Sequence, residues 1–539
     1  MRAKLDTLLL LARTLVWLKP VQIYGRIWFR LYRPKPRTID AVQYRQPMKN
    51  WHPVAHSRSM TGPATFSFLN RTETLASPQD WNAGHLPKLW LYNSHYFDDL
   101  NARDAQQRAE WHRELIGRWI SENPAGQGNG WEPYPTSLRI VNWSKWLNSG
   151  NAPTPHIIQS LATQADWVSR RLEQHLLGNH LFANAKALVF AGCVLNGPEP
   201  DRWLVLGLKL LARELPEQIL PDGGHFERSI MYHAILTEDV LDLIQIATLY
   251  PDRIAPEMAA GWEEHASRML HFLNGMTHPD RQISFFNDGA FGIAPDPEAL
   301  FAYAATLAIK EPNASSKTEL FAESGYARLV SGPAIVLADV ARIGPDYLPG
   351  HAHADTLSFE FSLDGQRVFV NGGTSVYGGN RAQRMLERST QNHNTVCVND
   401  QNSSEVWSDF RVARRAKPSG VELRDLSHGH VLVGSHDGYR RINGPVHKRE
   451  WRLTEDTLVI EDTLTGPHLP AIARFRIHPD LEATTTTIFA KRPISIRSSG
   501  TLSLEHGEWS PEFGKVIPCK VLTLAFSGQH STLQLSWER

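Results

Sequence analysis

The sequence predicts a multidomain α+β protein in which a helical domain precedes an antiparallel β-sandwich. From about residue 100 to 310, apolar residues recur at i, i+3, i+4 and i+7, which is the helical period. Near residue 325 the period switches to two, as in strands with one buried face. Because 539 residues exceed one ordinary domain, we divide the chain into an N-terminal helical segment (1–50), a helical domain (51–320) and a β-domain (321–539).

The helical domain is predicted from seven amphipathic segments of similar length, separated by connections that contain Pro or Gly. They cover 106–123, 135–150, 154–177, 203–220, 238–250, 262–276 and 297–310. Many antiparallel helices with short connections favour a helical toroid or a solenoid. The sequence has no fixed-period repeat of the kind that defines a solenoid family.

The β-domain is predicted from segments of alternating apolar and polar residues. They cover 326–343, 356–373, 394–400, 430–438, 450–464 and 520–528. Turn residues join them, and the pair Asp364-Gly365 predicts a tight hairpin.

Charge and cysteine content narrow the function classes. Lys plus Arg and Asp plus Glu balance at 56 each, so no overall field attracts nucleic acid, and an anionic ligand would need a local basic cleft. The three cysteines, Cys193, Cys397 and Cys519, form neither a zinc pattern nor a disulfide framework, which favours a reducing compartment.

The N-terminal segment combines basic, apolar and aromatic residues. Residues 1–20 resemble a signal peptide in outline, but Asp6 and Arg13 interrupt the apolar run and no small-residue cleavage site follows. We therefore expect no cleavable signal and no transmembrane helix, and favour a cytoplasmic over a periplasmic location. Residues 21–37 either lie on a membrane surface or pack on the protein's own core, and the second interpretation is favoured.

Four short segments carry side chains suited to acid–base chemistry. They are "GNH" with Asn179 and His180, "MYH" with Tyr232, "GHAHAD" with His351 and His353, and "HNTV" with His393. In extended backbone His351 and His353 would share one face. Taken singly, each segment is explained equally well by a structural role.

Taken together and in this order, the segments resemble the heparinase II/III family of polysaccharide lyases, a superfamily that includes oligoalginate lyases. "WEPYPTSLRIVNW" at 131–143 and "FNDG" at 286–289 add to the resemblance, which runs from about residue 20 to 460. It implies an incomplete (α/α) toroid followed by an antiparallel β-sandwich.

The resemblance also implies a reaction and residues for it. These lyases cleave a 4-linked uronic acid by β-elimination, which requires neutralisation of the carboxylate, a base at C5 and an acid at the leaving oxygen. Asn179, assisted by His180, would bind the carboxylate. Tyr232 would be the acid, and also the base when proton and leaving group lie on one face. His351 would be the base for the opposite stereochemistry.

A structural zinc is the one cofactor that the resemblance suggests, and no organic cofactor is expected. His353 and His393 match the family's histidine ligands, whereas Asn371 stands where the family has Asp. Since an amide is a poorer zinc ligand than a carboxylate, zinc binding is left open.

For an anionic uronate polysaccharide we expect aromatic and basic contacts in the cleft. Trp131 and Tyr134 are candidates for stacking on sugar rings, and Arg139, Arg384 and Arg388 for binding carboxylate or sulfate. The alternative for each arginine is a solvated salt bridge.

Two other functions fit the same residues. A uronate C5-epimerase would return the proton to the opposite face of the sugar instead of eliminating. A non-catalytic glycan-binding protein of polysaccharide biosynthesis would bind without reacting. The sequence does not specify which polysaccharide is bound.

Overall fold

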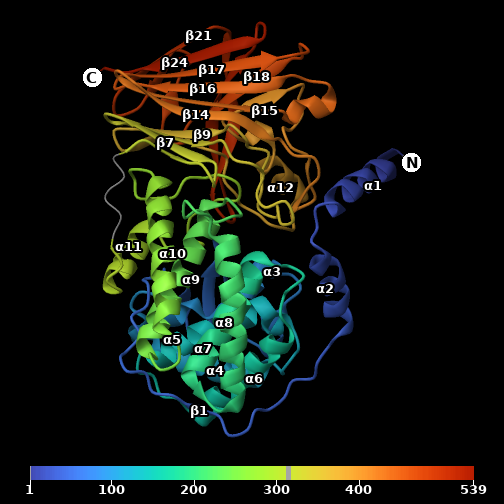
Figure 1. Ribbon diagram of the computed structural model, residues 1–539, viewed down its shortest axis with the longest axis vertical. Coiled ribbons are helices and arrows are strands. Elements are labelled where there is room, and N and C mark those ends of the chain that lie inside the picture. The colour runs from blue at the N-terminus through green and yellow to red at the C-terminus, as the bar shows by residue number, and fades with distance from the viewer. Residues whose placement is uncertain (1, 311–316, 539) are drawn as a thin grey trace.

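The computed structural model describes residues 2–310 and 317–538. Figure 1 shows a helical part below a stack of antiparallel sheets, with two N-terminal helices along the outside of the molecule. Helices therefore precede strands along the chain, as predicted. The described segment before residue 311 ends shortly after a helix, and the next strand begins at Glu319, close to the predicted change of domain.

Most helices lie in the first 310 residues. They are α1 (Arg2–Leu15), α2 (Pro20–Leu31), α3 (Lys88–Tyr96), α4 (Ala109–Glu122), α5 (Pro133–Asn148), α6 (Pro155–Arg170), α7 (Gly178–Val194), α8 (Pro198–Gln218), α9 (Ile230–Leu249), α10 (Pro256–Gly275) and α11 (Pro297–Thr306), with α12 (Arg381–Glu387) in the second half. The predicted helix 154–177 ends at Arg170. The predicted helix 238–250 begins eight residues earlier, where the Ser229 hydroxyl accepts a hydrogen bond from the Tyr232 backbone N–H as an N-cap.

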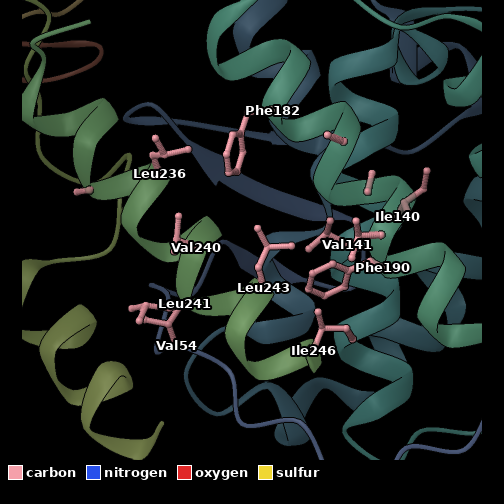
Figure 2. Packing of buried hydrophobic residues seen from close by; sticks show 14 of the residues in the cluster. Val54, Ile140, Val141, Phe182, Phe190, Leu236, Val240, Leu241, Leu243 and Ile246 are labelled. Carbon is pink, nitrogen blue, oxygen red and sulfur yellow. The ribbon is translucent and has the colours of Figure 1, made fainter. Parts of the chain in front are cut away.

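The core of the helical part is formed by α5, α7 and α9, which are buried on almost every side. Figure 2 shows Val141 of α5 beside Phe190 of α7 and Leu243 of α9. An all-round apolar helix is stable only inside a protein. The first turns of α7 and α9 therefore have a rigid support.

The sheets of the second half are antiparallel throughout. The strands are β6 (Glu319–Phe321), β7 (Tyr326–Ser331), β8 (Ala334–Asp339), β9 (Phe359–Leu363), β10 (Gln366–Phe369), β11 (Val396–Val398), β12 (Val406–Trp407), β13 (Arg411–Val412), β14 (Pro418–Leu426), β15 (Gly429–His436), β16 (Val446–Leu453), β17 (Thr457–Thr465), β18 (Ala471–Arg476), β19 (Glu482–Ala483), β20 (Thr487–Phe489), β21 (Ile494–Ser498), β22 (Thr501–Glu512), β23 (Lys515–Ala525) and β24 (His530–Ser536). They form a five-stranded sheet (β10-β9-β8-β7-β6), a four-stranded sheet (β11-β18-β23-β22), an eight-stranded sheet (β14-β15-β16-β17-β24-β21-β20-β19) and the pair β12-β13. The predicted hairpin at Asp364-Gly365 joins β9 to β10, and both turn residues have positive φ, as a tight hairpin requires.

Five short strands in the helical half were not predicted. They are β1 (Gln43–Tyr44), β2 (Met60–Gly62), β3 (Thr65–Phe68), β4 (Arg71–Thr74) and β5 (Leu195–Asn196). Each has only two to four residues, which is too short for a periodic signal.

The N-terminal segment differs from the favoured expectation. α1 and α2 do not bury their apolar stripes on the core: Leu8, Val16 and Trp28, among others, are exposed. Polar and cation–π contacts hold the two helices to the body instead, including Arg13 to Glu405 at 3.2 Å and the Arg171 guanidinium 3.7 Å above the Phe29 ring. In the described part of the chain, no helix is long and apolar enough to cross a membrane.

Candidate active site

A large cleft, with a cavity volume of about 1900 Å³, brings together residues from distant parts of the chain. The helical half contributes Asn179, His180 and Tyr232 to its lining, and the β-domain half contributes His351 and Tyr377. All four predicted catalytic side chains therefore line one cleft.

Asn179 and His180 lie in the first turn of α7. The preceding Gly178 has a positive φ of 52°, and a Cβ there would lie 2.5 Å from Leu348 Cδ2 and 2.7 Å from Glu227 Oε1. Glycine is therefore required for the chain to enter α7 at this point of the cleft. The position of Asn179 beside Glu227 depends on that turn.

His180 is held by a carboxylate and an aromatic ring. Its Nδ1 lies 3.1 Å from Glu173 Oε1, and its ring contacts the Tyr134 ring in a tilted arrangement with centroids 4.5 Å apart. Burial by itself would lower the pKa of His180, but the Glu173 carboxylate outweighs burial and raises that pKa above 6.5. His180 is thus suited to carry a positive charge that faces an anionic ligand.

Tyr232 lies in the first turn of α9 against His351. The two rings stack with centroids 3.8 Å apart and an interplanar angle of 28°, and the Tyr377 hydroxyl donates a hydrogen bond to the Tyr232 hydroxyl at 3.2 Å. Burial raises the pKa of Tyr232 well above its ordinary value, although the bond from Tyr377 opposes this. The tyrosine is therefore a phenol at neutral pH, which suits an acid. It does not have the lowered pKa that a tyrosine base would need.

His351 and His353 share one carboxylate. His351 Nδ1 lies 2.8 Å from Asp288 Oδ2, and His353 Nε2 lies 2.8 Å from Asp288 Oδ1. The two imidazoles are adjacent as predicted, but they precede the strand, since β9 begins only at Phe359.

Asp288 is the buried anion of the site. Arg384 forms a bidentate ion pair with it, with Nη2 at 2.9 Å from Oδ2. Burial would raise the pKa of Asp288, but Arg384 and the imidazoles of His351 and His353 outweigh burial and hold that pKa well below its ordinary value. Because an ionised carboxylate only accepts, His351 must donate through Nδ1, which leaves Nε2 as its basic nitrogen.

Glu227 lies on the other side of His351. Its Oε2 is 3.4 Å from His351 Nε2. Burial raises the pKa of Glu227, although His351 and a hydrogen bond from the Asn179 backbone oppose this. Glu227 thus connects the first turn of α7 to the imidazole.

Two of the three predicted metal ligands are hydrogen-bonded to each other, and the third is hydrogen-bonded to the backbone. His353 Nδ1 and His393 Nε2 are hydrogen-bonded to each other at 3.1 Å, so one facing nitrogen carries a proton. The Asn371 amide oxygen accepts from the Asn394 backbone N–H at 3.2 Å. Among the described residues no three His, Cys, Asp or Glu side chains are grouped as a metal site. Zinc binding stays a prediction from the resemblance, and the reaction proposed for this site uses no metal.

Of the predicted substrate contacts, Tyr134 lines the cleft and the others do not. Trp131 is buried, and its indole N–H donates to the Asn123 carbonyl at 3.2 Å. Arg139 is fully buried, with its guanidinium 3.7 Å above the Trp119 ring and bonded to Gln164. The prediction of direct sugar contact is therefore wrong for Trp131 and Arg139, which stabilise the helical core.

Arg384 and Arg388 are also fully buried and do not line the cleft. Arg384 is paired with Asp288, and Arg388 donates to the carbonyls of Ala352, Ser408 and Arg411. Direct substrate contact by these two arginines is likewise wrong. Since both bind the segment around His351 or its carboxylate partner, they hold the site in place.

Exposed cations line the cleft from other segments. They include Arg26 and Arg30 of α2, Arg58, Arg71, Lys88, Arg103 and Arg411. No local motif marks these positions, because they come together only in three dimensions.

Sequence reasoning missed Glu227, Asp288 and Tyr377 as site residues. Asp288 could have been predicted, because it lies in the "FNDG" segment that contributed to the resemblance. Asn287 in this segment adopts a left-handed backbone conformation. Glu227 and Tyr377 carry no distinguishing pattern. Their partners are more than 100 residues away in the sequence.

Two family models match the chain. "Heparinase II/III N-terminus" matches residues 97–296, and "Heparinase II/III-like, C-terminal" matches residues 313–538. Together they span most of the chain, including Asn179, His180, Tyr232 and His351. The chain belongs to the heparinase II/III family.

Individual relatives and structures agree with this assignment. A heparin-sulfate lyase of Bacteroides stercoris is 23% identical over 67% of this chain and 59% of its own length. FtsZ-localized protein C of Caulobacter vibrioides is 28% identical over 71% of this chain and 67% of its own length. The crystal structure of heparinase III superposes with a TM-score of 0.66 at 18% identity, covering 87% of this chain and 79% of that one.

The chain covers less than two thirds of the length of the heparin-sulfate lyases that it matches. This chain spans 59%, 49% and 48% of three heparin-sulfate lyases that it matches. The structural likeness shows a shared fold.

Proposed function

We propose that the protein is a polysaccharide lyase that cleaves a 4-linked uronic-acid polymer by β-elimination, on an (α/α) toroid that faces a β-sandwich. The observation that carries this proposal is the stacking of the protonated Tyr232 phenol on His351 inside the cleft. An acid beside a base is what elimination needs and what mere binding does not.

The residues divide the reaction between them. Asn179 and the cationic His180 bind the uronate carboxylate and lower the cost of negative charge at C5. His351 Nε2 takes the C5 proton while Asp288 stabilises the resulting imidazolium. As the C4–O bond breaks and the C4–C5 double bond forms, Tyr232 gives its proton to the leaving oxygen.

The polymer is bound by the exposed cations of the cleft. Arg58, Arg103 and Arg411 are candidates for carboxylate or sulfate contacts, and Tyr134 for contact with a sugar face. This supplies the local positive charge that a chain with balanced total charge requires.

The test is incubation of purified protein with heparan-, chondroitin- and alginate-type polymers while ultraviolet absorbance of the C4–C5 double bond is followed. A rise on one polymer supports the lyase and identifies its substrate class. Deuterium incorporation at C5 without a rise would indicate a uronate C5-epimerase. Neither signal on any polymer would overturn both enzymatic proposals.

A second candidate is a non-catalytic role in which the protein localises with FtsZ. It is favoured by FtsZ-localized protein C, which matches this chain over about two thirds of both lengths. Co-localisation with FtsZ in cells, together with silence in the polymer assay, would support it.

A further inference from the structure

The apolar faces of α1 and α2 are the largest gathering of exposed hydrophobic side chains in the described part of the chain. Eleven of its eighteen large exposed hydrophobics lie between residues 5 and 31. They are Leu5, Leu8, Leu9, Leu15, Val16, Trp17, Ile23, Tyr24, Ile27, Trp28 and Leu31, and we call them the N-terminal patch. Such a concentration is typical of an interaction surface.

The spacing places each helix's share of the patch on one face. In α1, Leu5, Leu8 and Leu9 are three and four residues apart, and in α2, Ile23, Ile27 and Leu31 recur every four residues. Each helix therefore presents a stripe, as an amphipathic helix does.

The opposite side of α2 already binds the body of the protein. Phe29 packs on Arg171, the side-chain amide of Gln22 donates to the Tyr347 carbonyl at 3.0 Å, and a Cβ on Gly25 would lie 3.3 Å from His175 Cβ. The Lys19 ammonium, just before the helix, pairs with Glu217 at 2.7 Å. These contacts fix the orientation of α2, which Figure 1 shows along the edge of the molecule, and leave Ile23, Ile27 and Leu31 exposed.

Charge indicates what covers the patch. Residues 1–37 contain nine Lys or Arg and only one acidic residue, Asp6, although the whole chain is balanced. In the described part of the chain, no carboxylate lies within ion-pair distance of Arg26, Arg30 or Arg33. Two copies of this face would bring like charges together, whereas an anionic bilayer complements both the charge and the apolar stripe.

We propose that the N-terminal patch docks the protein on an anionic phospholipid surface, with the helices lying in the interface. Because Ile23, Ile27, Arg26 and Arg30 also line the cleft, docking places the cleft mouth beside the membrane. The proposal does not depend on the lyase reaction.

The test is flotation of the full chain with vesicles of phosphatidylcholine alone and with vesicles that also contain phosphatidylglycerol. We expect the wild-type chain to float with the anionic vesicles and at least about tenfold less with the zwitterionic ones. The double variant Trp28→Glu/Leu31→Glu should reduce anionic flotation by about tenfold or more. The matched control is Val205→Glu/Val516→Glu, which adds the same two charges at exposed apolar positions of α8 and β23 and should float like the wild type.

A second variant tests the charge separately. Arg30→Gln/Arg33→Gln leaves the apolar stripe intact and should weaken flotation and its dependence on salt. Failure of the wild type to float would overturn the proposal, as would unchanged flotation of Trp28→Glu/Leu31→Glu. A dimer in light scattering that Trp28→Glu/Leu31→Glu dissociates would also overturn it, since a second copy would then cover the patch.

Discussion

The phenol of Tyr232 and the imidazole of His351 stack with ring centroids 3.8 Å apart, although the two residues are more than 100 positions apart in the sequence. Tyr232 is fixed by the first turn of α9, and His351 by Asp288. Acid and base thus meet only when the helical part and the β part are assembled.

Tyr377 is expected to lower the pKa of Tyr232, the proposed acid. Tyr377→Phe removes the hydrogen bond to the Tyr232 hydroxyl while keeping the ring that packs on Phe513. The pKa of Tyr232 should rise further, so kcat for the lyase reaction should fall by about tenfold with little change in KM. Steady-state kinetics would measure this, and a change confined to KM would contradict the assignment.

Substrate binding should depend on pH through His180. Because its pKa is raised above 6.5 by Glu173, the imidazole is cationic below that raised pKa and loses its charge as pH rises through it. The KM for a uronate polymer should therefore increase as pH rises through the raised pKa of His180. Glu173→Gln should move the increase to lower pH, and superimposable profiles would show that His180 does not bind the carboxylate.

The buried ion pair between Arg384 and Asp288 should matter for both stability and activity. Arg384→Met leaves an uncompensated buried carboxylate, which we expect to lower the free energy of unfolding by about 3–5 kcal/mol. Arg381→Met, an exposed position on the same helix, is the control and should change it by less than about 0.5 kcal/mol. Urea denaturation measures both, and equal effects would contradict the role given to Arg384.

A second buried carboxylate should make stability depend on pH. Burial raises the pKa of Asp355 to about 6, so its stabilising contribution is complete below its unfolded pKa and is lost as pH rises through the folded value. Asp355→Asn should remove this pH dependence. Relative to the wild type, it should raise the free energy of unfolding by on the order of 1 kcal/mol more at about pH 8 than at about pH 5. Asp400→Asn, at an exposed turn, should leave the pH dependence as in the wild type.

Periodicity predicted the fold well because it reports which residues are buried. Most of the predicted helices were found, as was the hairpin at Asp364-Gly365, where two residues alone determine the turn. The exposed stripes of α1 and α2 were misjudged. An amphipathic pattern shows that a face is apolar, but not what covers it.

The site was predicted only where a local motif marked it. Asn179, His180, Tyr232 and His351 were found from such motifs, and all four line the cleft. Substrate contact was wrongly assigned to Arg139, because the length and charge of a side chain do not reveal that its guanidinium is buried against Trp119. Glu227 and Tyr377 could not be predicted, since only the folded chain brings them to His351 and Tyr232.

Tyr232 is proposed as the acid of the elimination. Comparing Tyr232→Phe with the wild type, on the polymer that gives the strongest double-bond absorbance, tests this role. Tyr24→Phe, an exposed position outside the cleft, serves as the control. Tyr232→Phe should lower the rate by about 10²–10⁴, while binding of the polymer and the melting temperature should stay close to wild type. A Tyr232→Phe rate within a few-fold of the wild type would contradict this role.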